Sequence, residues 1–173
     1  MAKVAFSKLN KVKSIPDSSI TIGENVIEVK QYLGLVDKID LMTRVAEQAG
    51  DEMGFFNIVK IKTFYIIEMI KAYTNITFTD KQMEDIGKLY DAIVMNKIWE
   101  QVSEGIPEEE RVYIWENTLE ITEQVTKYNS SVLGILKTIK SDYSETEFDL
   151  EKISGMIQDP EQLKFVKDLL EKV

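Results

Sequence analysis

Of all the residues in this sequence, three clusters of carboxylates come closest to a motif that could bind a metal or carry out a reaction. They are Glu108, Glu109 and Glu110; Asp80, Glu84 and Asp85; and Glu116, Glu120 and Glu123. Carboxylate oxygens suit hard cations such as Mg²⁺, but the first cluster is better explained as charges in the first turn of a helix and the second as a solvated helix surface. The third is spaced like the carboxylates of a di-iron helical bundle, yet that site needs Glu-x-x-His pairs and the chain has no histidine. We therefore expect no metal site.

Nucleophilic and cofactor chemistry lack the residues that they need. The chain has no cysteine and no histidine, which excludes thiol catalysis, cysteine zinc sites and the commonest general base. Gly23 and Gly155 lack the spacing and the following lysine of a phosphate-binding loop. Ser130 and Ser131 have only Lys127 nearby to activate them. We predict that the protein is not an enzyme, with no catalytic residue and no cofactor.

Charge is distributed unevenly along the chain. The net charge is −9, yet Lys3, Lys8, Lys11 and Lys13 precede the first acid, Asp17, so the opening segment carries +4 and the rest carries −13. An acidic body repels nucleic acid, and two arginines are too few for a nucleic-acid-binding arm. No apolar run reaches the ~18 residues of a transmembrane helix, and the opening lacks a signal peptide's apolar block. We expect no direct nucleic-acid or membrane partner, and a place in the cytoplasm.

The N-terminal part predicts a basic arm followed by a β-hairpin. In residues 19–29, two β-branched runs flank Gly23, Glu24 and Asn25, a combination typical of a short hairpin loop. A two-stranded ribbon is marginal alone, so its apolar residues must pack on the helices of this chain or add to a partner's sheet. These residues are Ile20, Ile22, Ile27 and Val29. Of the two alternatives, we favour packing on the chain's own helices.

The remainder of the chain shows helical periodicity. We expect helices over residues 35–49, 58–73, 79–102, 107–143, 149–156 and from 159 onward. The 58–73 segment is apolar on most of its circumference, as a central helix is, and Thr79 to Gln82 form a capping box. The 107–143 helix begins with Pro107 and three glutamates, and residues 129–131 are its weak point. The fold class is mainly α: a helical bundle built on one long C-terminal-half helix, with a small N-terminal β-hairpin, in a single domain over 1–173 (1–33 arm and hairpin, 34–173 helical body).

Three aromatic residues flank the expected turn at Gly105. Trp99, Tyr113 and Trp115 either cap this helical corner, which we favour, or serve as exposed anchors for a partner. The candidate partner-binding residues are therefore Lys3, Lys8, Lys11, Lys13, Ile20, Ile22, Ile27, Val29, Trp99, Tyr113 and Trp115.

Three sets of sequence phrases carry a resemblance to known proteins. They are MAKVAFSKLN (1–10) with IEVKQYL (27–33), YTNITFTDKQ (73–82) with KLYD (88–91), and YNSSVLGIL (128–136). Together they resemble small uncharacterised proteins encoded among the virion structural genes of phages and prophages of Gram-positive bacteria. Gly34 stands where that pattern has a proline. The resemblance implies a virion or assembly role and transfers no catalytic residue.

Two functional hypotheses follow. The first is a non-enzymatic bacteriophage virion or assembly protein that acts through protein–protein contacts: tail-assembly-chaperone-like, a connector or an accessory virion component. Its partners would be other phage structural proteins of the tail, portal or capsid, met in the host cytoplasm or in the virion, and self-association is possible. The alternative is an acidic inhibitor of a host nucleic-acid-binding enzyme, whose acidic surface would imitate a phosphate backbone.

Overall fold

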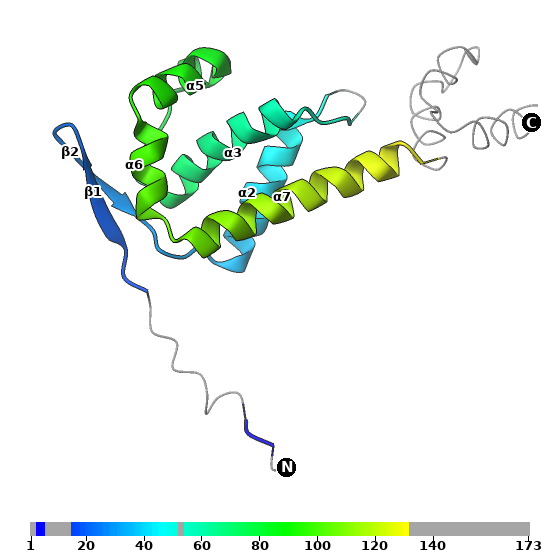
Figure 1. Cartoon of the computed structure of the whole chain (residues 1–173), viewed down its shortest axis with the longest axis horizontal. Helices are drawn as coiled ribbons and strands as arrows, with labels where there is room; N and C mark the ends of the chain where they lie inside the picture. The colour runs from blue at the N-terminus through cyan, green and yellow to red at the C-terminus, as the bar shows by residue number, and fades with distance from the viewer. Residues whose placement is uncertain (1–2, 6–14, 52–53, 132–173) are drawn as a thin grey trace, which may run out of the picture.

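The computed structural model describes residues 3–5, 15–51 and 54–131, which form a mainly helical fold with one antiparallel hairpin (Figure 1). The strands are β1 (Ser18–Ile22) and β2 (Asn25–Val29). The helices are α2 (Leu35–Ala49), α3 (Ile58–Tyr73), α4 (Asp80–Glu84), α5 (Ile86–Met95), α6 (Ile98–Gly105) and α7 (Glu108–Asn129). The predicted fold class is confirmed, and the bounds of α2 and α3 are those expected from the sequence.

The hairpin forms where the β-branched runs predicted it. Ile20 pairs with Ile27 and Ile22 with Asn25, so the loop has two residues, Gly23 and Glu24. Gly23 has a φ of +62°, the left-handed conformation that glycine adopts freely at the first position of a type II′ hairpin turn. Glycine at this position therefore fixes the register that turns the isoleucines toward the helices.

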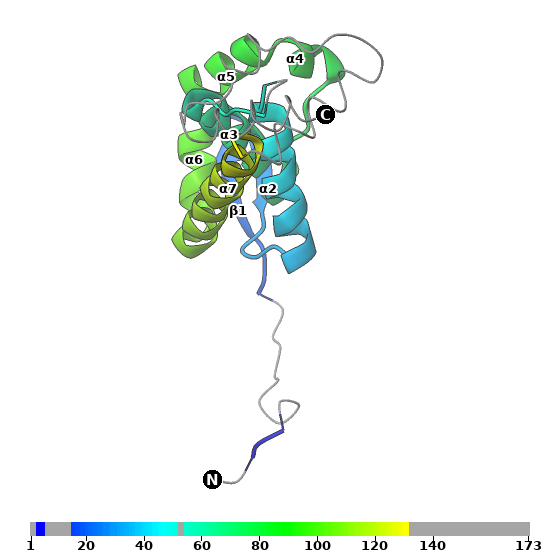
Figure 2. The same ribbon diagram turned by 90° about the vertical axis from the view of Figure 1, so that its right-hand side faces the viewer.

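Helix α3 lies at the centre of the described fold. It packs against α2 and α6, and α2 also packs against α7. In the view of Figure 2, α6 lies on one side of α7 and α2 on the other. The fully buried apolar side chains come from β2, from helices α2, α3, α5, α6 and α7, and from the residue after α6. They are Val29, Leu41, Val45, Ile67, Met69, Ile70, Tyr73, Ile93, Val102, Ile106 and Ile114.

The expected helix over residues 79–102 is three helices. The capping box at Thr79 is present and opens α4. The side chain of Asp85 accepts the N–H of Lys88 and starts a new helix, α5, because a short acidic side chain competes for backbone donors. Lys97 then adopts a φ of +54° between α5 and α6. The prediction of a continuous helix here is wrong, and the two breaks allow α6 to turn back toward the hairpin.

Helix α7 is the longest described helix, but it is shorter than expected. It begins at Glu108, with Pro107 as the residue before the first turn, and ends at Asn129. Ser131 N–H bonds to the carbonyl of Tyr128 in a tight turn, so the end falls at the polar run that the sequence marked as weak. Residues 132–143 and the two helices expected after them lie outside the described residues.

Candidate functional site

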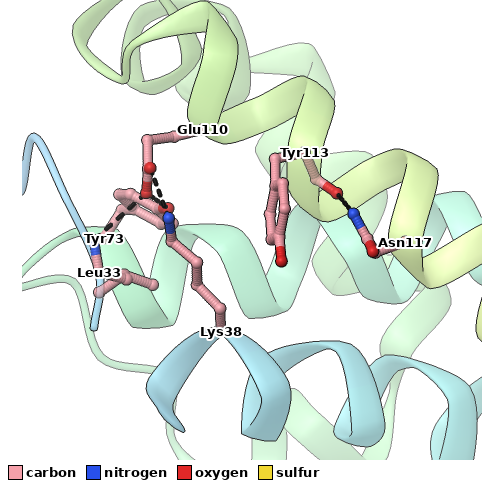
Figure 3. Close-up of polar contacts among 6 residues, drawn as sticks. All are labelled: Leu33, Lys38, Tyr73, Glu110, Tyr113 and Asn117. Atoms are coloured by element: carbon pink, nitrogen blue, oxygen red, sulfur yellow. Dashed lines mark hydrogen bonds and ion pairs between the residues drawn. The ribbon is translucent and has the colours of Figure 1, made fainter. Parts of the chain in front are cut away.

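A buried polar cluster joins α2, α3, α7 and the segment before α2 (Figure 3). The ammonium of Lys38 donates to Oε1 of Glu110 across 2.5 Å. The phenol of Tyr73 and the backbone N–H of Leu33 both donate to Oε2 of the same carboxylate, at 2.6 and 3.2 Å. Burial disfavours the charged form of Glu110, but these hydrogen bonds outweigh it and lower the pKa of the carboxyl below its usual value.

The burial of Lys38 decides which side of α2 reaches solvent. A lysine stem is apolar, so it can line the core while its ammonium meets a carboxylate. With Lys38 and Leu41 turned inward, three of the apolar positions that predicted the helix are turned outward. Leu35, Val36 and Ile39 are 60, 69 and 48% exposed. Helical periodicity identified the helix correctly, but it did not identify the buried side of its first turns.

Two further exposed aromatic residues lie beside Lys38, one just before α2 and one on α7. The ammonium lies 4.3 Å from the ring centroid of Tyr32 and 5.2 Å from that of Tyr113, both within cation–π range. Figure 3 shows Tyr113 pointing from α7 toward α2. Both rings are about half exposed. We call the surface formed by Tyr32, Leu35, Val36, Ile39 and Tyr113 the α2–α7 face.

The exposed charges in the first turns of α2 and on the Tyr113 side of α7 are all acidic, whereas the nearest cations are the exposed Lys30, two residues before Tyr32, and Arg44 farther along α2, whose side chain is 42% exposed. The acidic residues are Asp37 and Asp40 on α2 and Glu109, Glu116 and Glu120 on α7. The three glutamates are spaced four, three and seven residues from Tyr113, so they share its side of the helix. Between residues 35 and 43 and between 108 and 120, both fully described, no lysine or arginine is exposed. The face is therefore an apolar surface with an acidic rim.

A second buried carboxylate, Glu68 of α3, is paired with basic and amide side chains and has a structural role. Arg44 Nε and Lys71 Nζ approach it to 2.7 and 2.6 Å, and Gln48 donates at 3.4 Å. Burial opposes its ionisation, but these partners lower the pKa of the carboxyl. A general acid needs a raised pKa at neutral pH, which neither Glu68 nor Glu110 has. Within the part of the chain that the structure describes, no group of three or more acidic residues is placed to hold a metal ion.

The predicted hairpin residues lie against the protein's own helices. Ile20, Ile22 and Ile27 are half buried against the core, and Val29 is completely buried. A Cβ on Gly105 would lie 3.3 Å from Ile20 and 3.4 Å from Val29, which shows how closely α6 approaches the strands. Packing on the chain's own helices is therefore the arrangement present.

The outer edge of β1 is the part of the hairpin that still suits strand addition. Glu28 N–H points away from β1 and bonds to Asn75 Oδ1 at 3.2 Å. Its cross-strand partner Ser19, and Thr21 two residues on, therefore direct their backbone groups away from β2. No backbone partner for Ser19 or Thr21 occurs among the described residues. Addition of a partner strand to this edge stays a prediction.

The predicted aromatic residues divide into two partly buried tryptophans and one exposed tyrosine. Trp99 and Trp115 make edge-to-face contacts with Tyr65, at centroid distances of 5.9 and 5.1 Å. Burial raises the pKa of Tyr65 to about 12, although the nearby Arg111 charge opposes this. The two tryptophans therefore cap the helical corner, whereas Tyr113 belongs to the α2–α7 face.

Of the predicted arm residues, the structure describes only Lys3. Lys3 is exposed. Lys8, Lys11 and Lys13 lie outside the described residues.

Comparison with known proteins gives no relative. No family model, curated protein or solved structure matches the chain. Among the described helices, none has the length and apolar character needed to cross a membrane.

Proposed function

We propose that this protein is a non-enzymatic bacteriophage virion or assembly protein that acts through protein–protein contacts, and that the α2–α7 face is its main contact surface. The single observation that carries the proposal is that five large apolar side chains, just before α2, in its first turns and on α7, are exposed, and that two of them, Tyr32 and Tyr113, lie within cation–π range of Lys38. Contiguous apolar surface with a polar rim is typical of a binding site for another protein. The resemblance to phage structural-module proteins supplies the setting: the host cytoplasm during assembly, or the virion.

The arrangement of the face favours a partner over a cofactor. Tyrosine rings give a large contact area at little conformational cost, and two of them flank the apolar centre. The acidic rim would select a partner segment that carries lysine or arginine beside apolar residues. Tail, portal and capsid proteins are the partner class that we propose, and tail-assembly-chaperone, connector and accessory roles are all compatible with such a surface.

A capture experiment tests the proposal. Tagged full-length protein is recovered from infected or induced cells, and bound proteins are identified by mass spectrometry at low and moderate salt. The variant Val36→Glu/Ile39→Glu places two negative charges on the α2 part of the α2–α7 face. We expect the amount of phage structural protein recovered with it to fall at least about tenfold. The matched control Val94→Glu/Met95→Glu charges two exposed apolar residues of α5 and should bind normally. Equal binding by both variants would refute the role of the α2–α7 face.

The alternative, an acidic inhibitor of a host nucleic-acid-binding enzyme, is favoured by the one-sign rim. Phosphate imitation depends on charge, so its binding should fall steeply between low and moderate salt. Glu116→Lys/Glu120→Lys should then abolish binding to a host nuclease or polymerase, whereas Val36→Glu/Ile39→Glu should preserve it. The opposite ranking of the two variants excludes this alternative.

A further inference from the structure

We propose that the α2–α7 face receives the N-terminal arm, residues 1–17, of a second copy of the same chain. This inference rests on the proposed function, because it names a partner for the same surface. Its result would be a self-associated protein in which each copy contributes an arm and a face. Three properties of the chain support it: charge, apolar content and the place where the arm leaves the body.

The charges of arm and face are complementary. The arm contains four lysines before its first acid, Asp17, so it is basic in a chain whose net charge is −9. The rim of the face contributes five exposed carboxylates and no exposed cation in its described turns. Attraction between the arm and the face orients the approach and disfavours pairing of two acidic faces with each other.

The apolar content of the arm suits the centre of the face. Val4 and Ile15, in the described parts of the arm, are 62 and 57% exposed. Phe6, Leu9 and Val12 are distributed among the lysines. In Figure 1 the segment at residues 3–5 lies away from the helices. The described parts of the arm and the α2–α7 face both expose apolar side chains, and each can bury the other.

The arm leaves the body beside the face. Ser18 Oγ accepts a 2.7 Å hydrogen bond from Gln31 Nε2, and the next residue after Gln31 is Tyr32 of the face. Seventeen extended residues span at most about 56–61 Å, enough to reach across to a neighbouring molecule. Because the arm's origin and the face are adjacent, two copies related by a two-fold axis can exchange arms reciprocally in a closed dimer.

Charge reversal with rescue tests the exchange in the full-length chain. Sedimentation velocity over a concentration series should show a dimer for the wild type. Lys8→Glu/Lys11→Glu/Lys13→Glu on the arm, and separately Glu116→Lys/Glu120→Lys on the face, should each weaken association at least about tenfold. An equimolar mixture of the two variants should restore association, because the acidic arm of one variant then meets the basic face of the other, and the basic arm meets the acidic face. Circular dichroism checks that both variants are folded.

Cross-linking identifies which copy supplies the arm. The chain has no cysteine, so single-cysteine variants report unambiguously. Val4→Cys and Val36→Cys, purified separately and mixed, should give a mixed disulfide dimer on oxidation. The control pair Val4→Cys and Met95→Cys should not.

Several results would overturn the inference. A wild type that is monomeric at all concentrations, or charge-reversed variants that associate like the wild type, would refute it. So would a Val4→Cys/Val36→Cys double variant that closes an intramolecular disulfide while the mixed single variants do not cross-link. If these results appear while Val36→Glu/Ile39→Glu still loses phage proteins, arm exchange fails and the proposed function stands. If that variant also binds normally, both fail.

Discussion

Tyr73, the last residue of α3, donates its phenolic hydrogen to the Oε2 atom of Glu110 in α7 across 2.6 Å. Tyr73 is completely buried, so this bond fixes the start of α7 against the central helix. The other oxygen of Glu110 holds the ammonium of Lys38, which turns α2 so that its first apolar residues face solvent. One carboxylate thereby connects the packing of three helices with the exposure of the α2–α7 face.

Loss of the Glu110 charge should destabilise the fold. Glu110→Gln leaves the ammonium of Lys38 buried without its counter-ion, and breaking a buried pair in this way typically costs about 3–5 kcal/mol. Urea unfolding of both proteins measures the difference. Glu123→Gln on the same helix is the control: its partner Lys127 is exposed, so the expected loss is below about 0.5 kcal/mol. Adding Lys38→Met to Glu110→Gln should recover part of the loss, and equal effects of the two single variants would contradict the prediction.

Acidification should weaken the fold below about pH 4.5. Burial opposes ionisation of Glu68 and Glu110, but their cationic and hydrogen-bonding partners outweigh it, so the pKa of each carboxyl lies below its usual value of 4.5. The stabilisation is complete above the unfolded pKa and is lost as the pH falls through the lower folded pKa. Unfolding free energies measured in steps from neutral pH to about pH 3.5 should therefore decline. Glu110→Gln should show a shallower decline, and an unchanged slope would indicate that Glu110 does not contribute.

Two glycines with positive φ should tolerate alanine unequally. Gly23 has open space where a Cβ would stand, so Gly23→Ala costs only the left-handed backbone, about 1 kcal/mol. At Gly54 (φ +73°) a Cβ would collide with Nδ2 of Asn129, which donates to the Gly54 carbonyl at 3.2 Å. Gly54→Ala should therefore cost about 1 kcal/mol more than Gly23→Ala, since that hydrogen bond is also lost. In an Asn129→Ala background the excess should vanish, as a thermodynamic cycle can measure.

Removal of the Gln31 side chain should loosen the hairpin. Its amide donates to Ser18 Oγ at 2.7 Å and to the Gly105 carbonyl at 2.8 Å, joining β1 to the end of α6. Gln31→Ala should cost about 1–2 kcal/mol and speed hydrogen exchange of the β1 and β2 amides. Gln101→Ala removes an amide that donates to the carbonyl of Lys97, the residue before α6, and not to the hairpin, so it should leave hairpin exchange unchanged. Accelerated exchange in α6 alone would show that the hairpin is held by other contacts.

Local signals in the sequence predicted the elements well. Apolar periodicity placed α2 and α3, the Thr79–Gln82 pattern placed a cap, and the glycine between β-branched runs placed the hairpin loop. These features depend on residues close in sequence, whose preferences are visible without the rest of the fold.

The α2–α7 face depended on distant partners and was not predictable in the same way. Lys38 is buried because Glu110, 72 residues later, supplies its counter-charge. Thr118 of α7 is completely buried, and its hydroxyl bonds to the Ile114 carbonyl. A hydropathy pattern counts both residues as polar, because it cannot show which polar groups have found partners.

The acidic rim should affect the tendency of this protein to aggregate at high concentration. The rims of two α2–α7 faces carry charge of the same sign at neutral pH, so they repel each other and oppose association of the apolar side chains of one face with those of another. Segments of opposite charge can still bind there. The repulsion depends on ionised carboxylates. Near the sequence pI of about 4.7 the net charge of the whole chain is close to zero, so the general repulsion between molecules is lost while the apolar side chains of the face stay exposed, and nonspecific aggregation should be greatest there.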